Sequence, residues 1–109
     1  MTEFIVVITA TPSQEEAQAI ADAAIEQRLA AAVQLIGPIR STFRWKEKIE
    51  RSEEWLCLLK TSRSLYQEVE QMIRAIHSYE LPGVTAVPII GGSEPYLDWY
   101  MAQLKPAAS

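Results

Sequence analysis

Residues 32–61 constrain the fold more than any other part of the chain, because they read as two long strands joined by a tight turn. From residue 32 to residue 45, apolar and polar side chains alternate with a period of two, the period of a β-strand. The returning arm, residues 49–61, alternates at first and then becomes wholly apolar. We interpret residues 46–48, Lys-Glu-Lys, as the three-residue turn of a long β-hairpin.

A three-residue turn determines which residues of the two arms face one another. The register that it predicts pairs opposite charges and apolar side chains: Arg44 with Glu50, Arg40 with Glu54, Trp45 with Ile49, and Ile39 with Trp55. Each such pair contributes roughly 0.2–1 kcal/mol, so we expect this register rather than its neighbours. Gly37-Pro38 interrupts the first arm, and because proline has no amide hydrogen to donate, we expect a bulge or an unpaired edge there.

The segments around this hairpin predict two more strands and three helices. Residues 4–10 and 84–90 are short apolar runs rich in β-branched side chains, as in the strands of a buried sheet. Residues 13–29, 64–77 and 95–104 carry apolar side chains at helical spacing. The first of these helices has Thr11 or Ser13 as its N-cap, and its apolar stripe comprises Ala17, Ile20, Ala21, Ala24, Ile25 and Leu29.

The resulting order is β-α-β-β-α-β followed by a C-terminal helix. This order predicts the α+β class and a ferredoxin-like split βαβ sandwich, formed by a single domain over residues 1–109. Helices cover only one face of such a sheet, and the long hairpin extends beyond them. An open apolar face and a long edge strand favour association with other chains, so we expect a closed oligomer.

The net charge and the cysteine content indicate which classes of binding partner and which cellular compartment to expect. The formal net charge of −4 disfavours nucleic acid as a partner. Cys57 is the only cysteine, so no internal disulfide is possible and a reducing compartment is the simpler expectation. The N-terminal apolar run reads as a strand rather than a signal peptide, and no apolar run approaches the ~20 residues of a membrane span. We therefore expect a cytoplasmic protein with no membrane partner.

Five short motifs stand out together along the chain. They are Glu26-Gln27-Arg28-Leu29-Ala30-Ala31, Phe43-Arg44-Trp45, Leu58-Leu59-Lys60-Thr61, His77-Ser78-Tyr79-Glu80-Leu81-Pro82 and Tyr96-Leu97-Asp98-Trp99. Their order and separations resemble those of the CutA family of divalent-cation tolerance proteins, over the chain from Val6 to about Leu104. The resemblance implies ferredoxin-like subunits that form compact homotrimers through their long hairpins. It also implies an association with tolerance to copper and other divalent ions, and an architecture similar to that of the PII signalling proteins.

The chain departs from the family pattern where metal chemistry would matter. Many relatives have a cysteine where Ala32 stands, some have one where Thr9 stands, and some have a second histidine where Ile76 stands. Among the residues that match the family pattern, His77 is therefore the only one that belongs to the soft or borderline class of metal ligands. Because a zinc or copper site takes three or four protein ligands, we expect weak metal binding at His77 unless three copies meet on a trimer axis. Relatives also often have glycine where Glu47 stands, so a left-handed residue there would be strained.

The candidate ligand-binding cleft comprises Trp45, Lys60, His77, Tyr79 and Glu80. His77, at the end of the second helix, is the candidate metal ligand. Its alternatives are to carry a proton or to cap the negative end of the helix dipole, and capping alone would explain a histidine there. Glu80 could accept a hydrogen bond from His77 or Tyr79, or pair with Lys60 across a subunit cleft. The alternative is that Tyr79 and Glu80 belong to a polar loop over a subunit interface.

Four apolar side chains of the hairpin are expected at the trimer interface. They are Ile39, Phe43, Trp45 and Trp55. Large rings on a hairpin usually anchor interfaces, although Trp45 and Trp55 could also stack a flat ligand. Cys57 is expected to be a small apolar residue of the core.

The chain lacks two common signatures of enzymes. It has neither a Gly-rich loop for a nucleotide phosphate nor a Ser/His/Asp or Cys/His set. The leading hypothesis is a non-enzymatic homotrimer that responds to divalent ions, with copper or another divalent cation as the candidate ligand. The alternative is a PII-like signalling module that binds a small anion or metabolite in the inter-subunit cleft through Lys60. Hydrolytic or isomerase chemistry resting on His77 and Glu80 is a third hypothesis.

Overall fold

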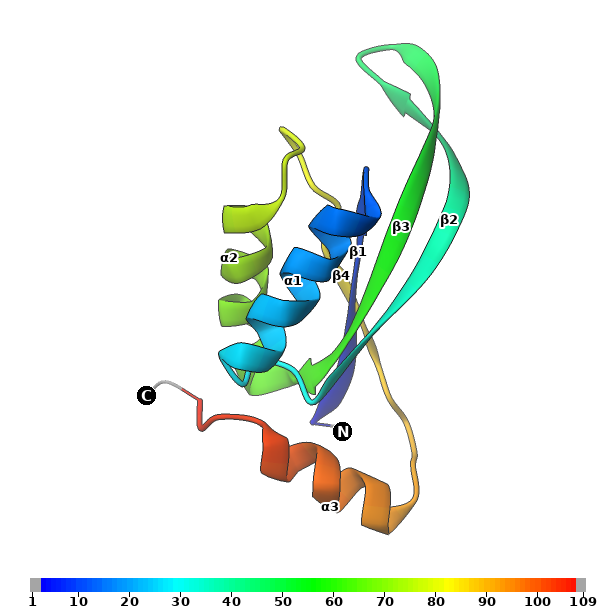
Figure 1. Ribbon diagram of the computed structural model, residues 1–109. Helices are drawn as coiled ribbons and strands as arrows, with labels where there is room; N and C mark the ends of the chain where they lie inside the picture. Colours follow the sequence, from blue (N-terminus) through cyan, green and yellow to red (C-terminus); the bar gives the residue numbers. More distant parts are fainter. Residues whose placement is uncertain (1–2, 108–109) are drawn as a thin grey trace.

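The protein, described over residues 3–107 by a computed structural model, forms one four-stranded antiparallel sheet with two helices on one face (Figure 1). The sheet order is β2-β3-β1-β4. The elements are β1 Phe4–Thr11, α1 Gln14–Glu26, β2 Ala32–Trp45, β3 Lys48–Ser62, a 3₁₀ turn Arg63–Leu65, α2 Tyr66–Ile76, β4 Thr85–Pro88 and α3 Glu94–Gln103. The predicted ferredoxin-like order, the long hairpin and the C-terminal helix are therefore confirmed.

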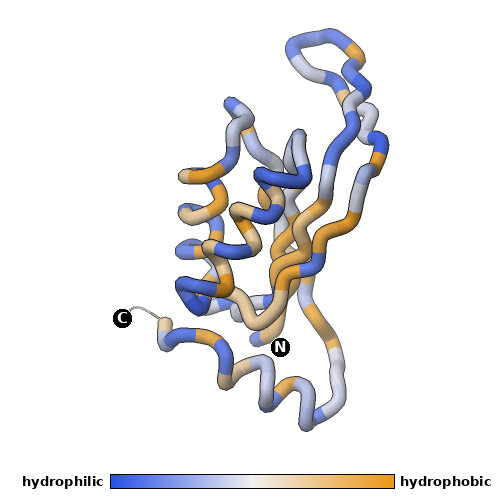
Figure 2. Tube along the Cα trace, in the orientation of Figure 1, coloured by the Kyte–Doolittle hydropathy of each residue, from blue (hydrophilic) through white to orange (hydrophobic). Residues whose placement is uncertain are grey.

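The core lies between the helices and the sheet. Odd-numbered residues of β1, such as Ile5 and Val7, are buried against the helical layer, and they meet Ile20 of α1 and Ile73 of α2. In Figure 2, hydrophobic and hydrophilic positions alternate along both helices, while the tip of the hairpin is mostly hydrophilic. Ser13 begins α1 because its side-chain oxygen accepts the amide hydrogen of Glu16, one of the donors that a helix N-terminus leaves free.

The hairpin turn differs from the prediction. It contains two residues, Lys46 and Glu47, with φ angles of 50° and 67°, so Trp45 pairs with Lys48. Two left-handed residues in a two-residue loop match the right-handed twist of the flanking strands, and this match outweighs the cost of placing two residues with side chains there.

The shorter turn moves every predicted pair of the hairpin by one position. The observed pairs include Arg44 with Ile49, Phe43 with Glu50, Arg40 with Glu53, and Ile39 with Glu54. The predicted register, which paired Arg44 with Glu50 and Ile39 with Trp55, was therefore wrong. Cross-strand pairs worth a fraction of a kcal/mol each did not determine the register, because the geometry of the turn fixes where pairing begins.

The predicted bulge at Gly37-Pro38 is confirmed. The pairing shifts register between Ile36 and Ile39, on either side of that dipeptide. The ring of Trp55 packs against Gly37: a β-carbon there would lie 2.2 Å from Trp55 Cδ1. The close approach of the indole thus requires glycine at this position.

Three other elements are shorter than predicted. Helix α1 ends at Glu26 rather than at residue 29. The second helical segment begins with the 3₁₀ turn, and α2 ends at Ile76 with His77 as its C-cap. The last strand covers Thr85–Pro88 rather than residues 84–90, although the Ile89 amide still donates to Phe4 O. In the sheet order given above, β2 and this short β4 are the two edge strands.

Helix α3 lies apart from the other two helices, at the end of the sheet opposite the hairpin tip (Figure 1). Tyr100 attaches it there: its ring is fully buried, and its hydroxyl lies 2.9 Å from Ile5 O and 2.7 Å from Thr61 O. The Phe4 ring meets the Tyr100 ring edge to face, with the ring centroids 4.8 Å apart. No helix in residues 3–107 has the length and apolar character needed to cross a membrane.

Candidate functional site

A groove of about 420 Å³ lies between the hairpin and the loop that follows α2. It is lined by Phe43, Trp45, Glu50, Ser52, Tyr79, Glu80 and Leu81. A neighbouring hollow of about 410 Å³ shares Phe43, Trp45, Tyr79 and Leu81 and continues over Ile8, Ala10 and Leu56 on the face of the sheet that no helix covers. The long hairpin and the loop after α2 thus form two walls of one continuous depression.

Acidic side chains and one lysine surround the groove. Glu50 and Glu80 line it, and Glu54 lines the neighbouring hollow. The ammonium nitrogen of Lys46 lies 3.5 Å from Glu80 Oε1 and 5.5 Å from the centre of the Trp45 ring. Both partners of this ion pair are more than two-thirds exposed, so the pair contributes little to stability.

A buried hydrogen bond joins Tyr79 to the sheet. Its hydroxyl donates to Glu54 Oε2 over 2.7 Å, and Glu54 is only 6% exposed. Burial, followed by this contact with the Glu54 carboxylate, raises the pKa of Tyr79 well above its usual range. The phenol therefore stays neutral and donates at every physiological pH, which keeps the loop after α2 attached to β3.

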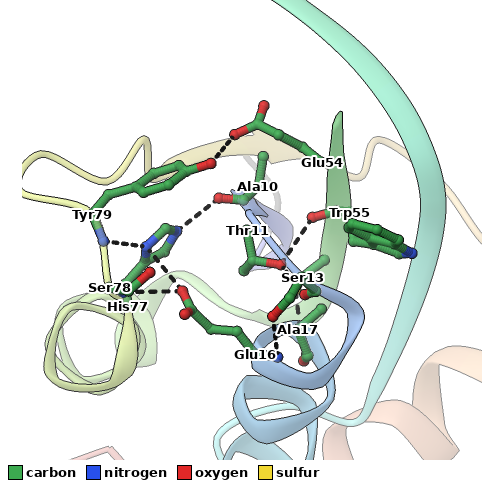
Figure 3. A network of polar contacts seen from close by, with 11 residues as sticks. Ala10, Thr11, Ser13, Glu16, Ala17, Glu54, Trp55, His77, Ser78 and Tyr79 are labelled. Atoms are coloured by element: carbon green, nitrogen blue, oxygen red, sulfur yellow. Dashed lines mark hydrogen bonds and ion pairs between the residues drawn. The ribbon is translucent and has the colours of Figure 1, made fainter. Parts of the chain in front are cut away.

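His77 is held between three elements, as Figure 3 shows. Its Nε2 lies 2.7 Å from Ala10 O at the end of β1, and its Nδ1 accepts the amide hydrogen of Tyr79 over 3.3 Å. Glu16 Oε2 lies 3.4 Å from the same Nδ1 and also accepts the Ser78 amide over 3.0 Å. Because a carbonyl oxygen only accepts, the hydrogen resides on Nε2, and the ring ties α2 to β1. The link to α1 is the hydrogen bond from the Ser78 amide to Glu16.

The structure brings together three of the five residues predicted for the cleft: Trp45, Tyr79 and Glu80 all line the groove. His77 lies beneath the loop, with its side chain fully buried, rather than in the groove. Lys60 is held at a different place, since its ammonium nitrogen is 3.1 Å from Tyr96 Oη and 5.2 Å from the centre of that ring.

The residues predicted for an interface fall in different surroundings. Phe43 is exposed and, with Trp45, lines the groove. Ile39 lies opposite Glu54 on the neighbouring strand. Trp55 packs against Gly37 of the same chain. Glu50 and Leu81 also line the groove, although no pattern in the sequence predicted them there. A two-residue turn, had it been recognised, would have placed Glu50 opposite Phe43 and so indicated the first of them.

The donor set does not fit a metal ion within one chain. Both ring nitrogens of His77 have partners in the protein, so no lone pair is free for a ligand bond. Burial, together with the charge of Glu16, raises the pKa of the Cys57 thiol from 9.0 to about 11, which keeps it protonated. Over residues 3–107, no group of three or more His, Cys, Asp or Glu side chains is arranged to hold a metal.

The raised pKa of Cys57 predicts a loss of stability at high pH. Because the folded state favours the protonated thiol, this contribution is complete below about pH 9 and is lost as the pH rises through 11. We expect the free energy of unfolding, from guanidinium denaturation, to fall by about 2 kcal/mol more in the wild type than in Cys57→Ala over this interval. Parallel pH profiles for the two proteins would contradict the prediction.

Comparison with known proteins identifies the family. The family model described as CutA1 divalent ion tolerance protein matches residues 5–103. The chain belongs to the CutA family. It is 38% identical over 97 residues to the divalent-cation tolerance protein CutA of Thermus thermophilus, an alignment that covers 89% of this chain and 93% of that protein. It is 43% identical over 88 residues to the human protein CutA, covering 81% of this chain and 49% of that protein.

Solved CutA structures have the same fold. CutA1 from Oryza sativa superposes with a TM-score of 0.94 at 32% identity, covering 97% of each chain. The Thermus thermophilus protein gives a TM-score of 0.91 at 34% identity, covering 94% of this chain and 99% of that chain. This CutA-family chain spans about half the length of the Arabidopsis and mouse relatives. The names of the relatives mention different cellular compartments: the Arabidopsis protein is called chloroplastic, and the Archaeoglobus fulgidus protein is called periplasmic.

Proposed function

We propose that this CutA-family protein is a non-enzymatic homotrimer that takes part in tolerance of divalent ions such as copper while binding metal weakly at best. Its lone, buried cysteine supports a reducing compartment such as the cytoplasm. The proposal has two parts, an assembly of three chains and a weak affinity for metal, and different observations support them.

Exposed apolar side chains support the assembly. Within residues 3–107, large hydrophobic side chains are exposed on the hairpin, on the loop after α2 and around β4: Ile36, Phe43, Ile49, Leu81, Val87 and Ile90. Leu81 is 69% exposed and Ile90 is 96% exposed. Soluble monomers rarely expose so many large apolar groups, and other copies of the chain would cover them.

The surroundings of His77 support weak metal binding. A copper or zinc ligand must offer a nitrogen lone pair, and here the Nδ1 lone pair accepts the Tyr79 amide while Nε2 donates to Ala10. Binding a metal at either nitrogen would break one of these buried hydrogen bonds, which costs about 1–3 kcal/mol when the partner is left unsatisfied.

Calorimetric titration with copper tests this part of the proposal. We expect no tight binding by the wild type, and the same heat from His77→Ala and His77→Gln. The glutamine variant keeps a donor in reach of Ala10 O and so controls for misfolding of the alanine variant. One tightly bound copper per subunit that disappears in both variants would show that His77 is a ligand.

The anion-binding alternative has less support than the proposal. It depends on Lys60, whose ammonium group is engaged with the hydroxyl and the ring of Tyr96. The groove itself carries the carboxylates of Glu50 and Glu80, which repel an anion.

A further inference from the structure

We propose that His77 is a proton-operated switch for the backbone of the loop after α2. When the ring is neutral, its Nδ1 accepts the amide hydrogen of Tyr79. When the ring is protonated, the same nitrogen donates to the carboxylate of Glu16 instead. All these groups belong to one chain, and the His77 side chain is fully buried within it, so the switch does not depend on the proposed assembly.

Two groups compete for Nδ1 of His77. The amide nitrogen of Tyr79 lies 3.3 Å from it, and Glu16 Oε2 lies 3.4 Å from it. Because the hydrogen of the neutral ring resides on Nε2, facing Ala10 O, Nδ1 carries only a lone pair. That lone pair suits the amide donor, but it faces a carboxylate oxygen, which also only accepts. The neutral ring therefore satisfies Tyr79 and leaves two acceptors, Nδ1 and Glu16, in contact.

A proton on Nδ1 reverses this preference. The new N–H can donate to the Glu16 carboxylate as a charge-assisted hydrogen bond. The side chain of Glu16 is only 15% exposed, so solvent screens the attraction weakly. The amide hydrogen of Tyr79 then meets a second donor and loses its acceptor. Nε2 keeps its bond to Ala10 O in both states, so the ring stays in place while the partner of Nδ1 changes.

The elements around the ring supply few other titratable groups. Glu16 of α1 contacts the ring, and β1 carries no titratable side chain. On β3, Glu54 accepts the hydroxyl hydrogen of Tyr79, and Cys57 is close enough to Glu16 to sense its charge. Arg74, one turn earlier on α2, has an ion-pair partner on its own helix. Raised pKa values keep Tyr79 and Cys57 protonated at pH 5–8, the range in which histidine changes its charge.

The switch acts on one of three attachments of the loop. The Ser78 amide donates to Glu16 over 3.0 Å, the Tyr79 amide donates to His77, and the Tyr79 hydroxyl donates to Glu54. Protonation of the ring removes the middle attachment and keeps the other two. We therefore infer that the backbone at Tyr79 is held less firmly in acid than at neutral pH, while the loop stays on the sheet through its phenol.

A pH titration from 8 to 5, followed in ¹H–¹⁵N spectra of the wild-type protein, tests the switch. We expect the Tyr79 amide proton to shift upfield, toward the position of an amide without an acceptor, in step with protonation of the His77 ring nitrogen. The Ser78 amide keeps Glu16 as its acceptor and should shift much less. A ring that stays neutral down to pH 5, or equal shifts of the two amides, would overturn the proposal.

Substitutions of glutamates on α1 assign the effect to one carboxylate. Glu16→Gln retains an oxygen that can accept the Ser78 amide but removes the negative charge, so the midpoint of the Tyr79 transition should fall by about one pH unit. Glu15→Gln removes the same charge from the neighbouring, exposed position of the helix and should leave the midpoint unchanged. Equal midpoints in these two variants would contradict a direct exchange between Tyr79 and Glu16.

His77→Gln removes the titrating group and keeps a donor for Ala10 O. The Tyr79 amide should then show no transition between pH 8 and 5. Far-UV circular dichroism establishes that the variant is folded, and the Glu16→Gln comparison decides the proposal if it is not. A transition that persists in folded His77→Gln would show that another group controls the loop.

Discussion

Trp45→Asp or Ile39→Asp is expected to convert an assembly of about 37 kDa, three chains of 12.3 kDa each, into a species near 12.3 kDa. In the proposed trimer both side chains are buried against other copies, and an aspartate there would be an unpaired charge away from water. Multi-angle light scattering after size exclusion gives the mass directly. Far-UV circular dichroism on the same fractions establishes that the subunit remains folded.

Lys48→Ala is the matched control for the assembly experiment. Lys48 lies on the same hairpin and pairs with Trp45, but its side chain is exposed and charged. Its loss should leave the mass of the assembly unchanged. A well-folded wild type with a mass near 12.3 kDa at micromolar concentration would refute the trimer whatever the variants do.

Tyr100→Ala is expected to lower the free energy of unfolding by about 3–5 kcal/mol, the range for deleting a large buried aromatic side chain. The ring is fully buried against Phe4, and the hydroxyl shares its one hydrogen between backbone oxygens of two strands, Ile5 O and Thr61 O. Without it, α3 loses its attachment to the sheet. Guanidinium denaturation followed by tryptophan fluorescence measures the change, since Trp99 belongs to α3.

Tyr100→Phe separates the ring from the hydroxyl. It keeps the packing and removes one hydrogen-bond donor, so we expect a loss of about 0.5–1.5 kcal/mol. All three proteins must be compared at one protein concentration, because association contributes to apparent stability. A loss below 1 kcal/mol in Tyr100→Ala would mean that α3 contributes little to the fold.

The fold could be predicted because its signals are local and repeated. Alternation over residues 32–61 indicates a hairpin whatever its exact register, and the stripe from Ala17 to Leu29 indicates a helix whatever its exact end. The bulge at Gly37-Pro38 followed from the chemistry of one dipeptide. Each of these features depends on residues that are neighbours in the sequence.

The register could not be predicted in the same way. The choice between a two- and a three-residue turn depends on whether Lys46 and Glu47 both adopt left-handed conformations, and neither is a residue that favours them. With the observed two-residue turn, Ile49 lies opposite Arg44. A turn that is one residue longer would place Glu50 there instead. A small local energy therefore decides the surroundings of every side chain along both strands.

The candidate site was predicted in part, for a related reason. Trp45, Tyr79 and Glu80 line one groove of the chain, but Lys60 lies elsewhere, because its ammonium group contacts Tyr96 of the C-terminal helix. The roles of His77 likewise depend on Ala10 and Glu16, which lie more than sixty residues earlier in the chain. No spacing rule connects residues so far apart in sequence.

The order of strands and helices, the family and the long hairpin were determined by the sequence, because periodicity and short motifs act over a few residues at a time. The partners of His77, Glu54 and Lys60 were decided only by the tertiary structure. It brings the end of β1 and the start of α1 against His77, the loop after α2 against Glu54, and α3 against Lys60. A side chain with several possible hydrogen-bond partners takes the one that packing places within about 3 Å of it.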